Sequence, residues 1–121
     1  SGSLKIHRIV AATNPGHAVN PAQIERQISG SFAYGLSAAL YGECTVKDGV
    51  IEQTNFDSYN VIRMDEMPKV ESIVMPTNDF WGGVGEPTIA VAAPAVLNAI
   101  AAATNRRVRS LPLMNHDLKK A

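Results

Sequence analysis

One helix-forming segment constrains the fold more than any other part of the chain. Asn20 suits a helix N-cap, Pro21 suits the first helical position, and Gln23 can complete a capping box. We expect this helix to run to about Leu40, with Gly42 near its C-terminal cap. One long face consists almost entirely of small residues, namely Ser29, Gly30, Ser31, Ala33, Gly35, Ser37, Ala38 and Ala39. Each interior glycine costs about 1 kcal/mol of helix propensity relative to alanine, so we expect another backbone or a ligand to approach this face closely.

The remaining segments predict strands and a hairpin. Residues 4–12 are rich in Ile and Val, which favours a strand. Asp48-Gly49 is a favoured type I′ turn and predicts a hairpin over residues 43–53. Further extended segments are expected over residues 55–64, 69–75 and 107–113.

A second helix is predicted over residues 88–104, with Pro94 marking a kink or a restart. Its apolar stretch, residues 89–103, would reach only ~22 Å, which is short of the ~30 Å hydrocarbon core of a bilayer. We therefore expect a buried helix of a globular domain and no transmembrane segment. The order of elements predicts the α+β class, with a mixed sheet and hairpins packed against two long helices.

Composition narrows the class of protein. The 121 residues are 45% hydrophobic and 18% charged, which fits one globular domain. Eleven basic and eleven acidic residues cancel, and the basic cluster at residues 106–109 is too small to favour nucleic-acid binding. The single cysteine, Cys44, excludes an internal disulfide and a cysteine-based zinc or iron–sulfur site, so it is interpreted as a small core residue in a strand.

The ends of the chain divide it into three parts. Residues 1–3 lack the apolar stretch of a signal peptide and are interpreted as a remnant of an added tag. Residues 4–113 are expected to form the domain, and residues 114–121 a polar tail. The missing initiator methionine predicts that the chain was cut from a longer one.

The glycine-rich run at residues 82–87, Gly-Gly-Val-Gly-Glu-Pro, is the strongest candidate for chemistry. Glycine allows a backbone to approach a ligand closely, and here it surrounds one carboxylate at the start of a helix. Glu86 has two interpretations, a catalytic carboxylate or one that satisfies free N–H groups at the helix N-terminus. Likewise, Gly83, Val84 and Gly85 either offer backbone groups to a ligand or only shape the turn.

Other candidates have plain structural alternatives. Gln27 either faces solvent or uses its amide to hold a cofactor. Asp65 and Glu66 are adjacent in an extended connection, so their carboxylates should point apart and serve a solvated or structural role. Phe80 and Trp81 either wall a substrate pocket or pack in a core or an interface.

Six segments carry a resemblance to one enzyme family. They are residues 27–30 (QISG), 35–43 (GLSAALYGE), 63–68 (RMDEMP), 82–87 (GGVGEP), 93–100 (APAVLNAI) and 109–113 (RSLPL). In order and spacing, from about residue 4 to residue 113, the chain resembles the C-terminal portion of the molybdenum-binding subunit of the xanthine dehydrogenase and aldehyde oxidase family. Within that family it is most similar to the isoquinoline 1-oxidoreductase beta-subunit branch.

The resemblance assigns roles to individual residues. It implies that Glu86 is the active-site base in hydroxylation of an aldehyde or N-heterocycle with oxygen from water, a role for which partial burial would tune the carboxylate. It implies that Gln27 helps to hold the molybdopterin cofactor, with Gly83, Val84 and Gly85 offering backbone. No residue of the chain is assigned as a ligand of the metal itself. Ser29 stands where the family frequently has Glu.

The resemblance also implies partners. The chain would be a fragment or a split subunit of a molybdenum-containing oxidoreductase, inactive alone, that joins the remainder of the molybdenum-binding subunit and a [2Fe–2S] subunit. The small-residue helix face and the Ala-rich helix would be docking surfaces, and their exposure would favour self-association of the isolated chain. The alternative is a non-catalytic, stand-alone α+β interaction domain that retains the fold without the metal. Substrate, electron acceptor and compartment, cytoplasmic or periplasmic, stay open.

Overall fold

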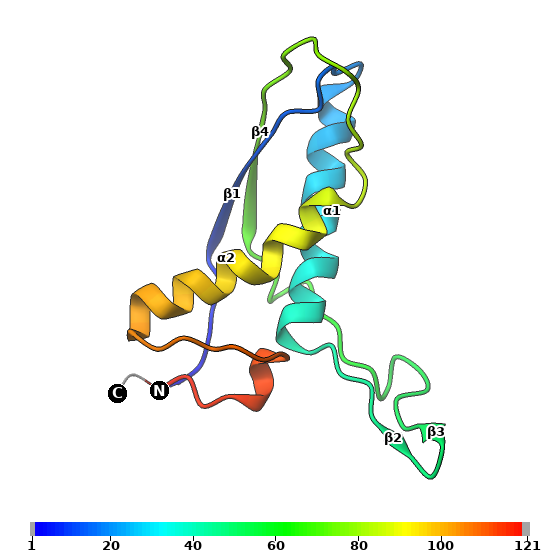
Figure 1. Ribbon diagram of the computed structural model, residues 1–121, viewed down its shortest axis with the longest axis vertical. Coiled ribbons are helices and arrows are strands. Elements are labelled where there is room, and N and C mark those ends of the chain that lie inside the picture. The colour runs from blue at the N-terminus through cyan, green and yellow to red at the C-terminus, as the bar shows by residue number, and fades with distance from the viewer. Residues whose placement is uncertain (1, 120–121) are drawn as a thin grey trace.

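The computed structural model describes residues 2–119 and confirms the α+β class. Figure 1 shows α1 along the long axis, α2 crossing it, β1 and β4 side by side, and a small hairpin projecting at one end. The elements are β1 (Arg8–Thr13), α1 (Pro21–Leu40), β2 (Val46–Lys47), β3 (Val50–Ile51), β4 (Lys69–Val74), α2 (Pro87–Thr104) and the 3-10 helix η1 (Leu113–Asn115).

The ends of α1 follow the capping residues in the sequence. The Asn20 side chain accepts a hydrogen bond from the backbone N–H of Gln23 at 3.3 Å, and Pro21 occupies the first turn. At the other end, the N–H of Gly42 donates to the Ser37 carbonyl at 3.0 Å. These contacts satisfy backbone groups that a helix end leaves free, so both predicted boundaries are confirmed.

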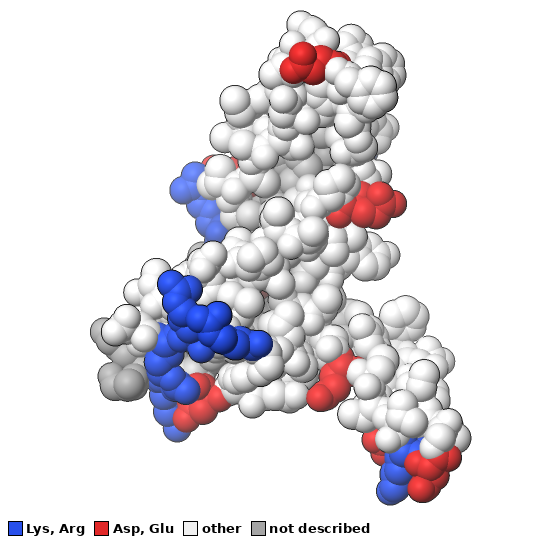
Figure 2. All heavy atoms as spheres, viewed as in Figure 1, with Lys and Arg blue, Asp and Glu red and all other residues white. Residues whose placement is uncertain are grey.

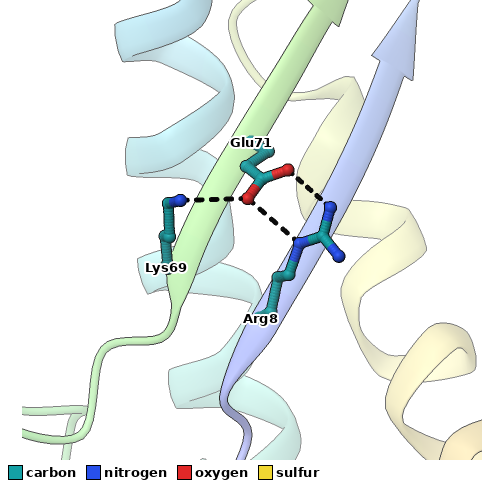
Figure 3. Close-up of polar contacts among 3 residues, drawn as sticks. All are labelled: Arg8, Lys69 and Glu71. Carbon is teal, nitrogen blue, oxygen red and sulfur yellow. Dashed lines mark hydrogen bonds and ion pairs between the residues drawn. The ribbon is translucent and has the colours of Figure 1, made fainter.

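The larger sheet is a parallel pair, β1 with β4, in the register Arg8 opposite Lys69 through Thr13 opposite Val74. On its exposed face, Arg8 forms two hydrogen bonds to the Glu71 carboxylate, at 3.0 and 2.6 Å (Figure 3). Lys69 Nζ lies 3.1 Å from the same carboxylate. The Arg8 hydrogen bond, aided by Lys69, lowers the pKa of Glu71 to about 2.

Two adjoining clusters of buried residues form the core, and α1 and α2 contribute to both. The first consists of Ile24, Ile28, Phe32 and Ala92, and the second of Leu36, Val96, Ile100 and Leu113. Ile9 of β1 packs against both clusters. The sheet therefore packs mainly against the first cluster, and the C-terminal segment packs against the second.

The crossing of α1 and α2 depends on a glycine. A Cβ built on Gly35 would lie 2.5 Å from the Cβ of Ala92 and 2.9 Å from the Ile89 carbonyl oxygen, closer than real Cβ contacts. The expected close approach is thus confirmed at Gly35. A Cβ on Gly30 would meet nothing within 4 Å among the described residues, so nothing in this chain requires that glycine.

Two predicted strands are wrong. Residues 55–59 form a turn, in which Ser58 and Tyr59 donate backbone hydrogen bonds to the Asn55 carbonyl at 3.0 and 2.8 Å, and residues 60–63 have no regular secondary structure. Such local bonds compete with strand pairing. Residues 107–113 run irregularly into η1, since Pro112 has no N–H to give to a ladder. The hairpin is confirmed, although it is reduced to two residues in each strand.

Cys44 also departs from prediction. It is exposed and precedes β2, so it is not a core residue. The hairpin that it precedes has no buried face, because all four strand residues of β2 and β3 are exposed. A strand pattern in this sequence therefore did not guarantee burial.

The prediction of a buried second helix is wrong as well. The helix α2 continues through Pro94, but only 17% of its 18 residues are buried, namely Ala92, Val96 and Ile100. It carries no charged residue, and Figure 2 shows Lys and Arg gathering near its C-terminal end. Among the described residues it is the one helix long and apolar enough to cross a membrane by length and composition alone. Its three buried side chains pack instead in the clusters shared with α1.

Candidate functional site

The glycine-rich run lies against the N-terminal half of α1. The Ser31 hydroxyl donates a hydrogen bond to the Gly85 carbonyl at 2.7 Å, and Ser31 is only 5% exposed. The Val84 side chain packs against the core cluster that contains Ile28 and Phe32. One buried polar contact and one apolar contact therefore fix the run just before α2 begins.

The turn after β1 holds the other end of this run. Gly82 donates to the Pro15 carbonyl at 2.9 Å, and Asn78 donates to the Gly16 carbonyl at 2.7 Å. Gly16 has a φ of +74°, and a Cβ there would collide with the backbone carbonyl of Phe80. Only glycine fits this position, because the turn and the loop meet backbone to backbone.

The aromatic pair before the run lies outside the core. Trp81 stacks on His17, with ring centroids 4.8 Å apart and an interplanar angle of 16°. Phe80 is 94% exposed and Trp81 is 63% exposed. Packing in the core of this chain is therefore ruled out for Phe80 and Trp81, which leaves a pocket wall or an interface.

Gln27 lies on α1 one turn before Ser31, and residues four apart share a helix face. A Cβ built on Gly85 would lie 3.9 Å from Gln27 Nε2. The fold thus brings the amide of Gln27 beside the glycine-rich run, although the two are far apart in the sequence. Gln27 is exposed, so its amide is accessible to a ligand.

Glu86 occupies the N-cap position of α2, with φ −94° and ψ −17°. Its side chain makes no capping hydrogen bond, and the carboxylate is exposed. Glu86 therefore does not satisfy free N–H groups at the N-terminus of α2, as its structural interpretation required. The expected partial burial is also missing from residues 2–119, so any enclosure of Glu86 must come from another polypeptide segment.

Backbone donors collect around the same position. Within residues 2–119, the N–H groups of Gly83, Val84, Gly85 and Glu86 have no hydrogen-bond partner. A Cβ on Gly83 would meet nothing within 4 Å, so the backbone there is open to a close approach. Together with the amide of Gln27, these groups are hydrogen-bond donors along the glycine-rich run that remain available to the oxygen atoms of an anionic ligand.

The described part of the chain offers no cluster of three or more His, Cys, Asp and Glu side chains that could hold a metal ion. A metal at this site would need ligands from outside these residues. The site's chemistry in this chain is therefore hydrogen-bond donation and one carboxylate.

The paired carboxylates Asp65 and Glu66 lie elsewhere. Glu66 accepts hydrogen bonds from the Tyr41 hydroxyl and, at 2.9 Å, from the Arg63 backbone N–H. The first bond raises the pKa of Tyr41 to about 12 and lowers that of Glu66. Glu66 thus ties the C-terminal end of α1 to a turn, which supports its structural interpretation.

Two contributors to the site were missed by reasoning from the sequence. Ser31 was counted only as one small residue among many, although a hydroxyl four residues after Gln27 on the same face was a usable signal. The turn at Pro15-Gly16 was interpreted only as a turn. Its role in holding the glycine-rich run depends on a contact between distant segments, which no local pattern reveals.

Comparison with known proteins bears out the resemblance. A molybdopterin cofactor-binding domain model matches residues 1–68. The chain is 32% identical, over 92% of its length, to isoquinoline 1-oxidoreductase subunit beta of Brevundimonas diminuta. It is 33% identical, over 89% of its length, to the putative xanthine dehydrogenase molybdenum-binding subunit of Escherichia coli. It spans only 14% and 15% of these two relatives, which are named as subunits of oxidoreductases.

A solved structure agrees at the level of fold. Quinoline 2-oxidoreductase from Pseudomonas putida 86 superposes with a TM-score of 0.81 over 90% of this chain and 15% of that one, at 22% identity. The arrangement in Figure 1 is therefore one that occurs as a small part of the fold of that oxidoreductase. From the matched model and the relatives together, the chain belongs to the molybdopterin cofactor-binding domain family and is a partial domain homologous to that of the xanthine dehydrogenase family.

Proposed function

We propose that this chain supplies the catalytic base and part of the molybdopterin site of a molybdenum hydroxylase that oxidises an aldehyde or an N-heterocycle with oxygen from water. It would do so only when joined to the remainder of the molybdenum-binding subunit. The single observation that carries the proposal is the juxtaposition of the Gln27 amide with Gly85, directly before the uncommitted carboxylate of Glu86.

Glu86 would act as the proton acceptor. A carboxylate that neither caps its helix nor forms an ion pair keeps its oxygen atoms available to take a proton from an attacking water-derived oxygen. General-base assistance of this kind is typically worth about 10²–10⁴-fold in rate.

Gln27 and the glycine-rich backbone would hold the cofactor. Gln27 Nε2 and the N–H groups of Gly83, Val84 and Gly85 can donate to its oxygen atoms while Ser31 keeps the run against α1. When bound, the molybdenum cofactor takes up the two electrons of the oxidation. The chain's part is to orient the cofactor and to move a proton at the Glu86 carboxylate.

Other parts of the enzyme would come from partners. The chain has one cysteine, too few for a [2Fe–2S] cluster, so clusters that carry electrons away would lie on a partner subunit. The remainder of the molybdenum-binding subunit would supply the rest of the cofactor site and the substrate pocket. Phe80 and Trp81, exposed beside the run, would form part of that pocket's wall.

A non-catalytic interaction domain is the second candidate, and the exposure of Glu86 favours it. A domain that had lost the metal would leave this carboxylate in solvent in the complete protein as well. The two functions therefore differ in what happens to Glu86 on assembly.

The deciding experiment replaces Glu86 by Gln in the assembled enzyme. Turnover should fall about 10²–10⁴-fold, with molybdenum content unchanged. Glu25→Gln, an exposed acidic residue on α1, is the matched control and should leave turnover unchanged. Unchanged turnover in Glu86→Gln would reject the catalytic proposal and leave the interaction domain as the function.

A further inference from the structure

We propose that the open edge of β1 and the groove between β1 and α2 receive an extended, apolar β-strand from the part of the molybdenum-binding subunit that this chain lacks. This inference rests on the proposed function, because it assumes that the chain works joined to that remainder. It goes further by naming the surface that is joined and the kind of segment that joins it.

The first observation is the free edge of β1. Lys69 donates to the His7 carbonyl at 3.2 Å, and Met75 donates to the Thr13 carbonyl at 2.9 Å. Along a parallel ladder the backbone groups of alternate residues point to opposite neighbours. The odd-numbered residues of β1 therefore bond β4, whereas Arg8, Val10 and Ala12 direct their backbone groups to the other edge. In the part of the chain described, no strand pairs there.

The second observation is a groove of about 990 Å³ along this same edge. Residues 3–13 form one wall, and Ile28 and Phe32 of α1 contribute apolar side chains between the walls. The opposite wall is the apolar side of α2, which includes Val91, Ala95 and Ala99. Most of the described residues that line the groove are apolar or small, and its charged residues, Lys5 and Arg8, lie on the β1 wall, so the α2 side of the groove suits an apolar segment.

The third observation is that both walls are incomplete: the β1 edge lacks a neighbouring strand, and the apolar side of α2 lacks a covering. A two-stranded sheet is marginal alone, and parallel strands are normally covered by helices on both faces. The helix α2 carries no charged residue, and only three of its 18 residues are buried. A strand added to β1 would bond Arg8, Val10 and Ala12 and bring apolar side chains against α2. One occupant thus completes both walls.

Two other occupants fit the groove less well. A lipid bilayer would leave the free N–H and C=O groups of β1 without partners, which hydrocarbon does not tolerate. A second copy of this chain could pair its own β1 edge with this one, so a homodimer is kept as an outcome of the test. The remainder of the subunit is the occupant with ample polypeptide, because the chain spans 14% and 15% of its two relatives.

Hydrogen exchange resolved to single amides, measured on the assembled molybdenum-binding subunit, tests the inference. The amides of Ile9 and Ala11 bond β4 and serve as internal references. If a strand occupies the edge, the amides of Val10 and Ala12 should exchange as slowly as these references, about 100-fold or more below the unprotected rate. Fast exchange at Val10 and Ala12 beside slow exchange at Ile9 and Ala11 would overturn the inference.

A pair of charge variants tests the α2 wall. Ala99→Lys places a charge in the groove, whereas Ala102→Lys places one on an exposed position of α2 that does not line it. Ala99→Lys should lower the yield of assembled subunit at least 10-fold relative to Ala102→Lys, and equal yields would overturn the inference.

Slow exchange at Val10 in a homodimer of this chain, lost on assembly, would assign the edge to a second copy instead. A chain that never joins the remainder would overturn the proposed function itself, whereas a joined chain with an unprotected β1 edge would overturn this inference alone.

Discussion

The two long helices differ in how much of their apolar surface this chain covers. In α1, seven residues are buried, both ends are capped, and the sheet, α2 and the glycine-rich run all pack on it. In α2, three residues are buried, and half of its 18 residues, none of which is charged, are exposed. The difference indicates that α1 is the interior helix of the described unit, whereas α2 lies at its boundary, with a side that we propose is covered by the remainder of the molybdenum-binding subunit.

The largest expected effect contrasts one residue from each helix. Leu36→Ala, at a fully buried position of α1, should lower the free energy of unfolding by about 2–5 kcal/mol. Val91→Ala, at a position of α2 that is 52% exposed, should change it by about 0.5 kcal/mol or less in this chain. Denaturant unfolding measures both. Comparable losses for the two variants would contradict the distinction between an interior and a boundary helix.

The next effect concerns the two interior glycines of α1. Gly35→Ala should destabilise the chain by about 1–3 kcal/mol, because the new methyl group collides with Ala92 and Ile89. Gly30→Ala meets open space and should stabilise it by about 0.5–1 kcal/mol through helix propensity. Opposite signs in thermal unfolding are expected. A stabilising Gly35→Ala would mean that α1 and α2 are too far apart at Gly35 for the new methyl group to collide.

A smaller effect is expected at the tether between α1 and the glycine-rich run. Ser31→Ala removes the hydrogen bond to the Gly85 carbonyl and should cost about 1 kcal/mol of stability. In the assembled enzyme it should also lower cofactor occupancy, because the run is no longer fixed beside Gln27. Ser29→Ala, a half-buried serine in the same helix, is the control. Equal occupancy in both variants would show that the tether has no part in the cofactor site.

The smallest effect is a pH dependence of the sheet. Glu71 has a folded pKa of about 2, lowered from 4.5 by Arg8 and then Lys69. Its contribution to stability is therefore present above about pH 4.5 and is lost as the pH falls toward 2. Because the group is exposed, added salt should weaken the effect. Glu71→Gln should show a flatter dependence of the unfolding midpoint over this range, and an unchanged profile would contradict a role for the ion pairs.

Local signals predicted local structure well. Asn20, Pro21 and Gly42 gave both ends of α1, and Asp48-Gly49 gave the hairpin, because caps and type I′ turns are determined by neighbouring residues. Pairing between distant segments was not predictable in this way. Strand-like composition at residues 55–64 and 107–113 led to wrong predictions, since neither segment pairs with a strand within residues 2–119.

The candidate site shows the same difference between local signals and contacts of distant segments. The sequence pointed to Glu86, Gln27 and the glycines through a resemblance to one enzyme family, and their proposed roles remain predictions. Their proximity was beyond local reasoning, because it depends on α1 passing beneath the start of α2. Ser31 and Gly16, which produce that proximity, were visible only as a small residue and a turn residue.

The hydrogen bond from Ser31 to Gly85 has a mechanical consequence for the carboxylate one residue later. Since the Gly85 carbonyl is bonded to α1 and Glu86 itself begins α2, the backbone is held on both sides of Glu86, and its carboxylate reorients mainly through its own side-chain torsions. Under the proposed function, the entry of a substrate would be accommodated by the opposite wall of the pocket, and the Glu86 carboxylate would keep its position from one turnover to the next.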